Sequence, residues 1–192
     1  MQNKKIGNRT IQDYSEIEGA NIGLLNGIYE IIRKLVSDKA VKYKRVLPIG
    51  EYFIDRWEKA SFLGFGDGAS VYDSAMVIGE VNVGCHTWIG PNVILDGSGG
   101  LSIGSYCSIS AGVQIYSHDS VKWAISGGKH DYEFAATTIG DRCYIGPNTI
   151  IQKGVTIGSG VIVGANSFVN KDIPSDSKAY GTPVKIENLS TL

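Results

Sequence analysis

The sequence from Thr137 to Ile173, TTIGDRCYIGPNTIIQKGVTIGSGVIVGANSFVNKDI, decides the fold of this chain. An aliphatic residue returns at every sixth position, namely Ile139, Ile145, Ile151, Ile157, Val163 and Val169. A period of six fits neither an α-helix nor an amphipathic strand, whose side chains alternate with a period of two. It indicates a short strand and a turn, repeated along the chain, with one buried side chain per unit. Because one unit cannot bury its apolar face alone, the units are expected to stack into an all-β solenoid.

The same phase continues towards the N-terminus with two interruptions. The in-phase apolar residues are Phe65, Val71, Val77, Val83, Ile89, Leu95, Ile103, Ile109 and Ile115. Ile103 follows Leu95 by eight positions, and Ile139 follows Ile115 by 24. The longer interval has Val121, Gly127 and Glu133 in phase, which together cannot form a core stripe, so residues 118–137 are predicted to leave the solenoid as a loop. A long loop on a regular scaffold is usually functional or disordered.

Two cysteines test this interpretation of the loop. Cys107 and Cys143 precede the in-phase residues Ile109 and Ile145 by two positions each. If three hexads make one coil and the loop adds no strand to the solenoid, Ile109 and Ile145 stack in adjacent coils. The two cysteines are then expected ~4.8 Å apart, at the spacing of neighbouring strands, with reduced thiols.

The other residues suggest a division of the chain into three parts. Residues 1–62 are predicted to form a helical segment, with a helix over 21–37 that begins at the N-cap Asn21, a basic link over 38–47 and a second helix over 51–60. This segment is expected to cover the apolar end of the solenoid; the alternative is a lid on the acceptor side or a trimer arm. Residues 63–174 are predicted to form about five coils, and residues 175–192 to leave them as a tail that could lie along a neighbouring coil.

Composition and charge exclude several classes of function. The chain has 18 basic and 19 acidic residues and a net charge of −1, so no electrostatic footprint for nucleic acid or an anionic membrane is expected. The start, MQNKKIGNRT, lacks the apolar core of a signal peptide, and no apolar run suggests a membrane span. Three cysteines without C-x-x-C spacing favour a reducing, cytoplasmic location and no metal site.

The I-G-x-x-x-x hexads resemble those of the hexapeptide-repeat acyltransferases, whose fold is a left-handed parallel β-helix. The likeness is greatest to sugar O-acetyltransferases of the maltose and galactoside type and their polysaccharide-modifying relatives. Their pattern has a histidine at a loop entrance, an I-G-x-x-x-W-I-G coil, then G-A-x-S-x-V-x-K-D-I-P and G-x-P. This chain has YSHD at 116–119 and matching segments at 139–146, 164–174 and 181–183. The resemblance implies acetyl-CoA as donor co-substrate, a saccharide or other small-molecule acceptor, a homotrimer and no metal.

His118 is the candidate catalytic residue. It follows the core position Ile115 by three residues, where the chain leaves for the loop. Imidazole titrates near neutral pH and suits the removal of a proton from an attacking hydroxyl. The resemblance implies that His118 is the general base; the alternative is a loop histidine without a role. Asp119 or a backbone carbonyl could orient the ring.

Further site residues are implied by the resemblance. On the donor side these residues are Tyr144, in place of the usual tryptophan, together with Ala165, Asn170, Lys171 and Lys185. On the acceptor side the resemblance implies a carboxylate near Asn92 and Asp96 that would hold a sugar hydroxyl. Trp123 and His130 are candidates because they lie in the loop, where Trp123 could stack on a pyranose and His130 could line the acceptor pocket. Solvation of exposed lysines and turn formation by Asn and Asp are the alternatives. The chain lacks the converging histidines that a zinc site of the γ-type carbonic anhydrases requires.

Three hypotheses of function follow. The first is an acetyl-CoA-dependent acetyltransferase that acts on a sugar hydroxyl in surface polysaccharide biosynthesis. The second is an N-acetyltransferase of a nucleotide-linked sugar, in which a neutral amine would need a base less. The third is a non-catalytic scaffold or binding module, which needs neither the loop nor His118. Fold alone does not decide among them.

Overall fold

The computed structural model describes residues 21–189 of the chain. These residues belong to two compact units, Met1–Phe53 and Ile54–Leu192. The first unit contains the helices α1 (Ile22–Tyr43) and α2 (Gly50–Phe53). The second contains the short helix α3 (Arg56–Phe62) and the solenoid.

Helix α1 begins where the sequence predicts and ends later. The side chain of Asn21 accepts a hydrogen bond from the backbone N–H of Leu24 at 3.0 Å, which confirms the predicted N-cap. The helix continues to Tyr43 and ends at Lys44 in the left-handed conformation (φ 53°). The prediction of a link from residue 38 was therefore wrong for residues 38–43, which contain no glycine or proline that would break a helix.

The predicted second helix, 51–60, is divided in two. Asp55 interrupts it and accepts from the backbone N–H groups of Trp57 and Glu58, so that a new helix, α3, begins at Arg56. Within the second unit, α3 packs against the first coil, because Ala60 is buried in the core and the Lys59 Nζ donates to three backbone carbonyls of that coil. Helix α3 thus covers the first coil, while a cap formed by the whole segment 1–62 stays a prediction.

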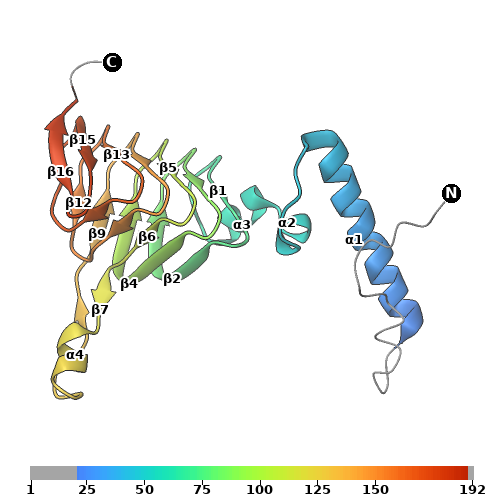
Figure 1. Cartoon of the computed structure of the whole chain (residues 1–192), viewed down its shortest axis with the longest axis horizontal. Coiled ribbons are helices and arrows are strands. Elements are labelled where there is room, and N and C mark those ends of the chain that lie inside the picture. The colour runs from blue at the N-terminus through green and yellow to red at the C-terminus, as the bar shows by residue number, and fades with distance from the viewer. Residues whose placement is uncertain (1–20, 190–192) are drawn as a thin grey trace. The chain divides into compact units, whose positions relative to one another are not determined.

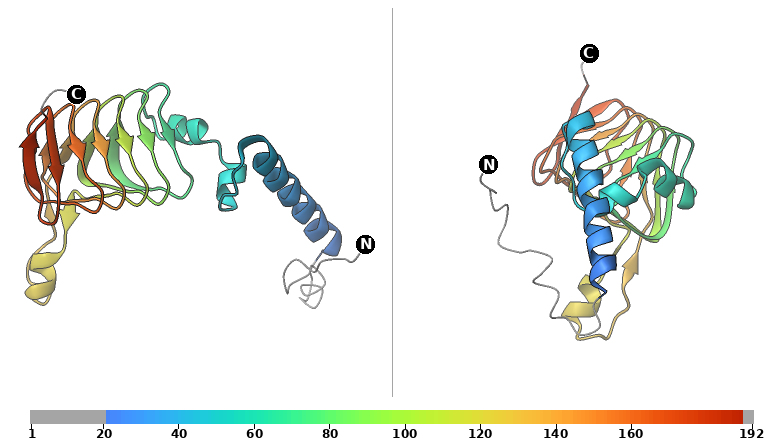
Figure 2. Two further views of the ribbon diagram at one scale, coloured as in Figure 1. Left: turned by 45° about the horizontal axis from the view of Figure 1, so that its top comes forward. Right: turned by 90° about the vertical axis from the view of Figure 1, so that its right-hand side faces the viewer.

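The solenoid has three faces of parallel strands, stacked coil upon coil (Figures 1 and 2). The first face contains β1 (Ser70–Val71), β3 (Trp88–Ile89), β5 (Ser108–Ile109), β10 (Tyr144–Ile145), β13 (Ile162–Val163) and β15 (Ser177–Tyr180). The other two faces are joined by the long strands β2 (Met76–Val83) and β4 (Ile94–Ile103). The start of β4 continues on the second face in β6 (Gln114–Ile115), β11 (Ile150–Ile151) and β14 (Phe168–Val169). The end of β4 continues on the third face in β9 (Thr137–Ile139) and β12 (Thr156–Ile157).

The six-residue phase marks the core, as predicted. Ile109, Ile115, Ile145 and Ile151 are all fully buried. Complete burial of one such side chain stabilises the fold by about 1.5–3 kcal/mol. Glycine lets the coils approach at the corners: a Cβ on Gly140 would lie 2.7 Å from the backbone nitrogen of Ser159 in the next coil.

The cysteines confirm the predicted register. Ile145 pairs with Ile109 in parallel, although 36 positions separate them in the sequence. The backbone N–H of Cys143 accordingly points at the Cys107 Sγ at 3.5 Å, and both thiols are free. The excursion between Ile115 and Ile139 therefore adds no strand to the three faces.

The excursion is itself structured, unlike the simple loop that was predicted. It contains β7 (His118–Asp119), the short helix α4 (Val121–Ile125) and β8 (Glu133–Phe134), and it ends where β9 begins at Thr137. Strands β7 and β8 pair in antiparallel fashion, with His118 opposite Phe134 and Asp119 opposite Glu133. Figures 1 and 2 show this yellow segment projecting from the coils.

The C-terminal segment stays with the solenoid instead of leaving it at residue 175. Strand β15 pairs in parallel with β13, and β16 (Lys185–Asn188) returns antiparallel to β15. Val163 pairs with Ala179, 16 positions later, whereas Ile145 pairs with Val163, 18 positions later. The last coil is therefore two residues shorter than the coil before it. Its core residue Ala179 does not fall on the six-residue phase, so the sequence pattern did not predict this coil. The first face contains six parallel strands in residues 21–189, where about five coils were predicted.

Candidate active site

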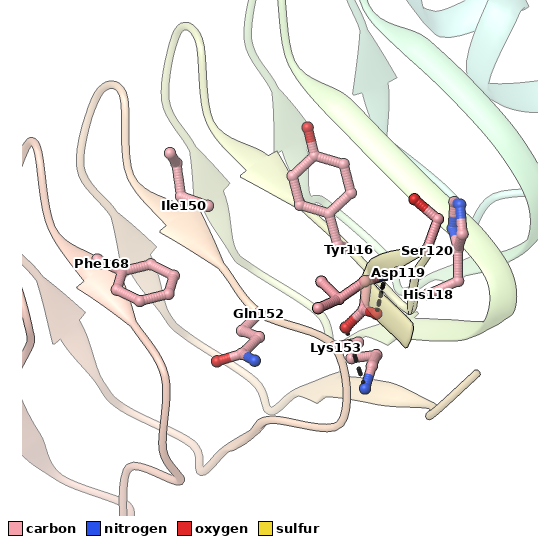
Figure 3. A pocket seen from close by; sticks show the side chains of 9 residues that line it. Tyr116, His118, Asp119, Ser120, Ile150, Gln152, Lys153 and Phe168 are labelled. Atoms are coloured by element: carbon pink, nitrogen blue, oxygen red, sulfur yellow. Dashed lines mark hydrogen bonds and ion pairs between the residues drawn. The ribbon is translucent and has the colours of Figure 1, made fainter. Parts of the chain in front are cut away.

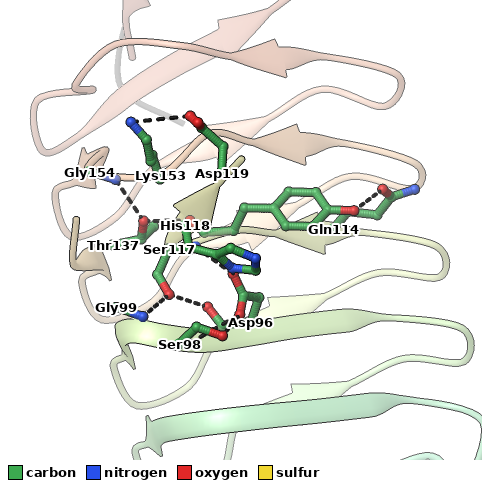
Figure 4. A network of polar contacts seen from close by, with 11 residues as sticks. Asp96, Ser98, Gly99, Gln114, Ser117, His118, Asp119, Thr137, Lys153 and Gly154 are labelled. Atoms are coloured by element: carbon green, nitrogen blue, oxygen red, sulfur yellow. Dashed lines mark hydrogen bonds and ion pairs between the residues drawn. The ribbon is translucent and has the colours of Figure 1, made fainter. Parts of the chain in front are cut away.

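His118 lies at the base of the excursion and contacts a carboxylate from the preceding coil. Its Nδ1 lies 2.5 Å from the Oδ2 of Asp96 (Figure 4). Asp96 directly follows the core residue Leu95, which pairs with Ile115. The strand register therefore brings the two residues together across 22 positions of sequence.

Asp96 is buried, and other hydrogen bonds hold its carboxylate in place. Oδ1 accepts from the backbone N–H and the hydroxyl of Ser98, and Oδ2 accepts from the backbone N–H of Ser117 at 3.0 Å. Burial by itself raises the pKa of this carboxyl. The hydrogen bonds from Ser98, Ser117 and His118 outweigh burial and lower the pKa of Asp96 to about 2. Asp96 is thus a carboxylate at all physiological pH values.

This arrangement selects one tautomer of neutral His118. A carboxylate only accepts hydrogen bonds, so Nδ1 carries the proton and donates it to Asp96. The lone pair of Nε2 is then free to accept a proton from another molecule. The rings of Tyr132 and Phe134 lie nearly parallel to the imidazole, with centroids 6.4 and 5.9 Å away. The imidazole is therefore held at one edge by Asp96 and flanked by aromatic rings.

A pocket of about 430 Å³ opens beside His118 on the second face (Figure 3). Its walls come from three coils and the start of the excursion: Tyr116, His118, Asp119, Ser120, Val121, Ile150, Gln152, Lys153 and Phe168. Ile150 and Phe168 are register partners in adjacent coils, so the apolar wall runs along the axis of the solenoid. A pocket of this volume is in the range of small-molecule sites.

The other predicted acceptor residues lie outside the lining of this pocket. Trp123 is on α4 and makes an edge contact with Tyr132, and His130 is exposed in the excursion. Asn92 occupies a corner in the left-handed conformation (φ 57°). Asp96, predicted to hold a sugar hydroxyl, has its carboxylate turned to Ser98, Ser117 and His118 instead.

The predicted donor residues are spread over several edges of the C-terminal coils. Tyr144 is on strand β10 of the first face, and Lys185 is on β16, which pairs with the last strand of that face, β15. Ala165 lies in the turn between β13 and β14, and Asn170 and Lys171 directly follow β14. All five side chains are exposed, and none lines the pocket beside His118. A single chain therefore does not bring them into one site with His118.

Sequence reasoning missed most of the pocket lining. Asp119, considered as a partner of His118, instead accepts from the backbone N–H of Val121 and pairs with Lys153. Gln152 and Lys153 stand one and two positions after the core residue Ile151, as Tyr116 stands after Ile115. The register that places Ile151 beside Ile115 was the signal that could have found them.

Within residues 21–189, no group of three His, Cys, Asp or Glu side chains converges to hold a metal ion. Over the same residues, no helix has the length and apolar character that crossing a membrane requires.

The repeat matches a known family model. Residues 136–171 match the model described as bacterial transferase hexapeptide (six repeats). This match covers the segment in which the six-residue phase is unbroken.

Two curated proteins are similar to this chain over longer segments. The Bacillus subtilis protein YvoF, named as an acetyltransferase, is 27% identical over 165 residues, which cover 84% of each chain. The Escherichia coli protein WcaF, named as a colanic acid biosynthesis acetyltransferase, is 29% identical over 56% of this chain and 57% of its own length.

A solved structure is similar over most of the solenoid. It is a hexapeptide-repeat-containing acetyltransferase from Vibrio cholerae in complex with acetyl coenzyme A, with a TM-score of 0.60, 25% identity, and coverage of 84% of this chain and 89% of that one. The predicted fold, a left-handed parallel β-helix, is thereby confirmed. Residues 136–171 thus carry the bacterial transferase hexapeptide repeat, and the chain is similar to acetyltransferases of this kind.

Proposed function

We propose that this protein transfers an acetyl group from acetyl-CoA to a hydroxyl group of a saccharide, with His118 as the general base. The observation that carries the proposal is the contact between Nδ1 of His118 and the buried Asp96 carboxylate, at the mouth of a pocket. It leaves Nε2 as a directed proton acceptor. A non-catalytic scaffold would need neither a buried carboxylate nor an oriented imidazole.

The chemistry follows from these groups. Nε2 of His118 takes the proton of the acceptor hydroxyl while its oxygen attacks the thioester carbonyl carbon. The new C–O bond gives a tetrahedral oxyanion, which a backbone N–H stabilises. Collapse breaks the C–S bond, and the imidazolium returns the proton to the leaving CoA thiolate. The ionised Asp96 stabilises the imidazolium between these two steps.

The donor is proposed to lie along the apolar wall of Ile150 and Phe168, which suits a thin pantetheine arm. Asn170 and Lys171 lie in the turn directly after β14, the strand that contains Phe168. There Lys171 can form an ion pair with a phosphate of the donor. Ala165, Tyr144 and Lys185 are proposed to contact the nucleotide end of acetyl-CoA. Because they are spread over other edges, the complete groove is proposed to form between chains of a homotrimer.

The acceptor is proposed to be a saccharide of a surface polysaccharide, which the name of WcaF supports. Trp123, His130 and Asn92 are proposed acceptor contacts, and Asp96 is reassigned to the positioning of His118. The oriented base favours a hydroxyl over an amine acceptor, since a neutral amine needs no base to attack.

The experiment is a panel of mono- and disaccharides and aminodeoxysugars, assayed for free thiol released from acetyl-CoA. We expect release with at least one hydroxyl acceptor, and none without an acceptor beyond slow hydrolysis. If only aminodeoxysugars support release, the O-acetyl proposal is wrong. If no donor or acceptor supports release, the enzymatic proposal is wrong.

A further inference from the structure

The two strands at the base of the excursion share one lysine of the solenoid. Lys153 lies in the turn after β11, and its side chain is 17% exposed. Its Nζ is 3.1 Å from Oδ2 of Asp119 on β7 and 3.5 Å from Oε2 of Glu133 on β8. Figures 3 and 4 show the Lys153 contact with Asp119 beside the pocket.

This lysine compensates a repulsion within the excursion. Asp119 and Glu133 are register partners across β7 and β8. Like charges directly opposite each other destabilise a strand pair. A cation between the two carboxylates turns this repulsion into attraction, and it ties both strands to the following coil, which contains β11.

A second lysine cannot do the same. Lys122 pairs with the other oxygen of Glu133, Oε1, at 2.6 Å. Lys122 belongs to α4, which is part of the excursion, so this ion pair makes no link to the solenoid. It is also 60% exposed, where an ion pair contributes little.

The position of His118 depends on the same strand pair. His118 precedes Asp119 on β7, and its register partner Phe134 stacks on its ring. We propose that Lys153 is a positioning residue that holds the β7–β8 pair on the coil and thereby places the Nε2 of His118 in the pocket. This inference rests on the proposed function only in so far as His118 acts as the base.

The kinetic test compares Lys153→Met, Lys153→Arg and the matched control Lys122→Met. A misplaced catalytic group costs about 10- to 100-fold in rate, so K153M is expected to lower kcat about tenfold or more. Arginine can pair with both carboxylates, so K153R should keep kcat within about threefold. K122M should stay within about twofold because its ion pair is exposed. Equal kcat for K153M and wild type would overturn the proposal, and so would an equal loss in K122M.

A structural test does not depend on activity. Hydrogen exchange of the amides in 118–135 should be about tenfold faster in K153M than in wild type, with exchange in the coils and the melting temperature unchanged. The double variant Lys153→Met with Asp119→Asn removes the repulsion, so it should recover most of the protection. Unchanged exchange in K153M would show that Lys153 does not hold the β7–β8 pair on the coil, even if the enzyme is active. If exchange is faster in K153M but the wild type shows no acetyl transfer, Lys153 still holds the strand pair. Only the proposed function is then wrong.

Discussion

A single oxygen of Asp96, Oδ2, accepts hydrogen bonds from the backbone N–H of Ser117 and from Nδ1 of His118. Two successive residues at the start of the excursion are thus fixed to one carboxylate in the coil below. The Ser117 hydroxyl adds to this connection, because it donates to the backbone carbonyl of Asp96 and accepts from the N–H of Gly99. The imidazole therefore has a defined place before any substrate binds.

The first prediction concerns Asp96→Asn. The asparagine amide N–H would donate to Nδ1 of His118, which moves the imidazole proton to Nε2 and removes the base. We expect kcat to fall on the order of 10²-fold or more, with little change in the KM for acetyl-CoA. Steady-state kinetics on the identified acceptor measures both constants.

The control for this variant is Ser98→Ala. It removes one hydrogen bond to Asp96 but leaves the carboxylate and its contact with His118. We expect a kcat within about tenfold of wild type, since one hydrogen bond to a charged group is worth about 1.5 kcal/mol. If Asp96→Asn is no slower than Ser98→Ala, Asp96 does not set the tautomer.

The second prediction concerns stability at acid pH. The pKa of Asp96 is about 2 in the folded chain, below its ordinary value of 3.8, so the unfolded chain binds the proton more readily. The carboxylate thus contributes stability that is fully present above pH 4 and is lost as the pH falls from about 4 to 2. At 1.36 kcal/mol per pH unit, the contribution is about 2 kcal/mol. Urea unfolding between pH 5 and 2 should show a steeper loss for wild type than for Asp96→Asn; parallel curves would contradict it.

The third prediction concerns the core. Ile145 is fully buried between Ile109 and Val163 in the coils on either side. Ile145→Ala should cost about 2–5 kcal/mol in the free energy of unfolding. The control Ile49→Ala removes the same atoms from a side chain that is 57% exposed and should cost less than about 0.5 kcal/mol. Urea unfolding at one fixed protein concentration measures both, and equal costs would refute the assigned core.

The fourth prediction is a homotrimer. The excursion exposes large apolar side chains, among them Ile125 at 81% and Phe134 at 58% exposure. Exposed large apolar side chains can mark an interaction site, and these are candidates for contacts between chains. Sedimentation should give three times the chain mass of 20.6 kDa. A monomer at every concentration tested would rule out both the trimer and a groove shared between chains.

The sequence predicted the parts of the fold that repeat. The six-residue phase located the buried Ile109, Ile115, Ile145 and Ile151, and the cysteine register was right because every third hexad must stack. The last coil was missed because a coil of 16 residues loses the phase that coils of 18 residues keep. Residues 38–43 were missed as helix because the basic side chains of 38–47 were interpreted as a solvated link.

The site was predicted less completely than the fold. His118 was identified by its place at the start of the excursion, and Asp96 was selected, but for contact with the acceptor. The strand register predicts which coil and which position a residue occupies. It does not predict the direction of the Asp96 side chain at a corner, and that direction decides which group the carboxylate binds. Lys153 was missed for a related reason: its partners Asp119 and Glu133 belong to a strand pair without periodicity, so the lysine resembles an ordinary solvated one.

The central claim is that His118 removes a proton from an acceptor hydroxyl. The most direct measurement is kcat for His118→Ala on the acceptor that releases thiol from acetyl-CoA with wild type, together with the KM for acetyl-CoA. We expect kcat to fall by about 10²–10⁴, the contribution of a general base, with the KM for acetyl-CoA little changed. A variant that keeps wild-type turnover on that acceptor would contradict the account.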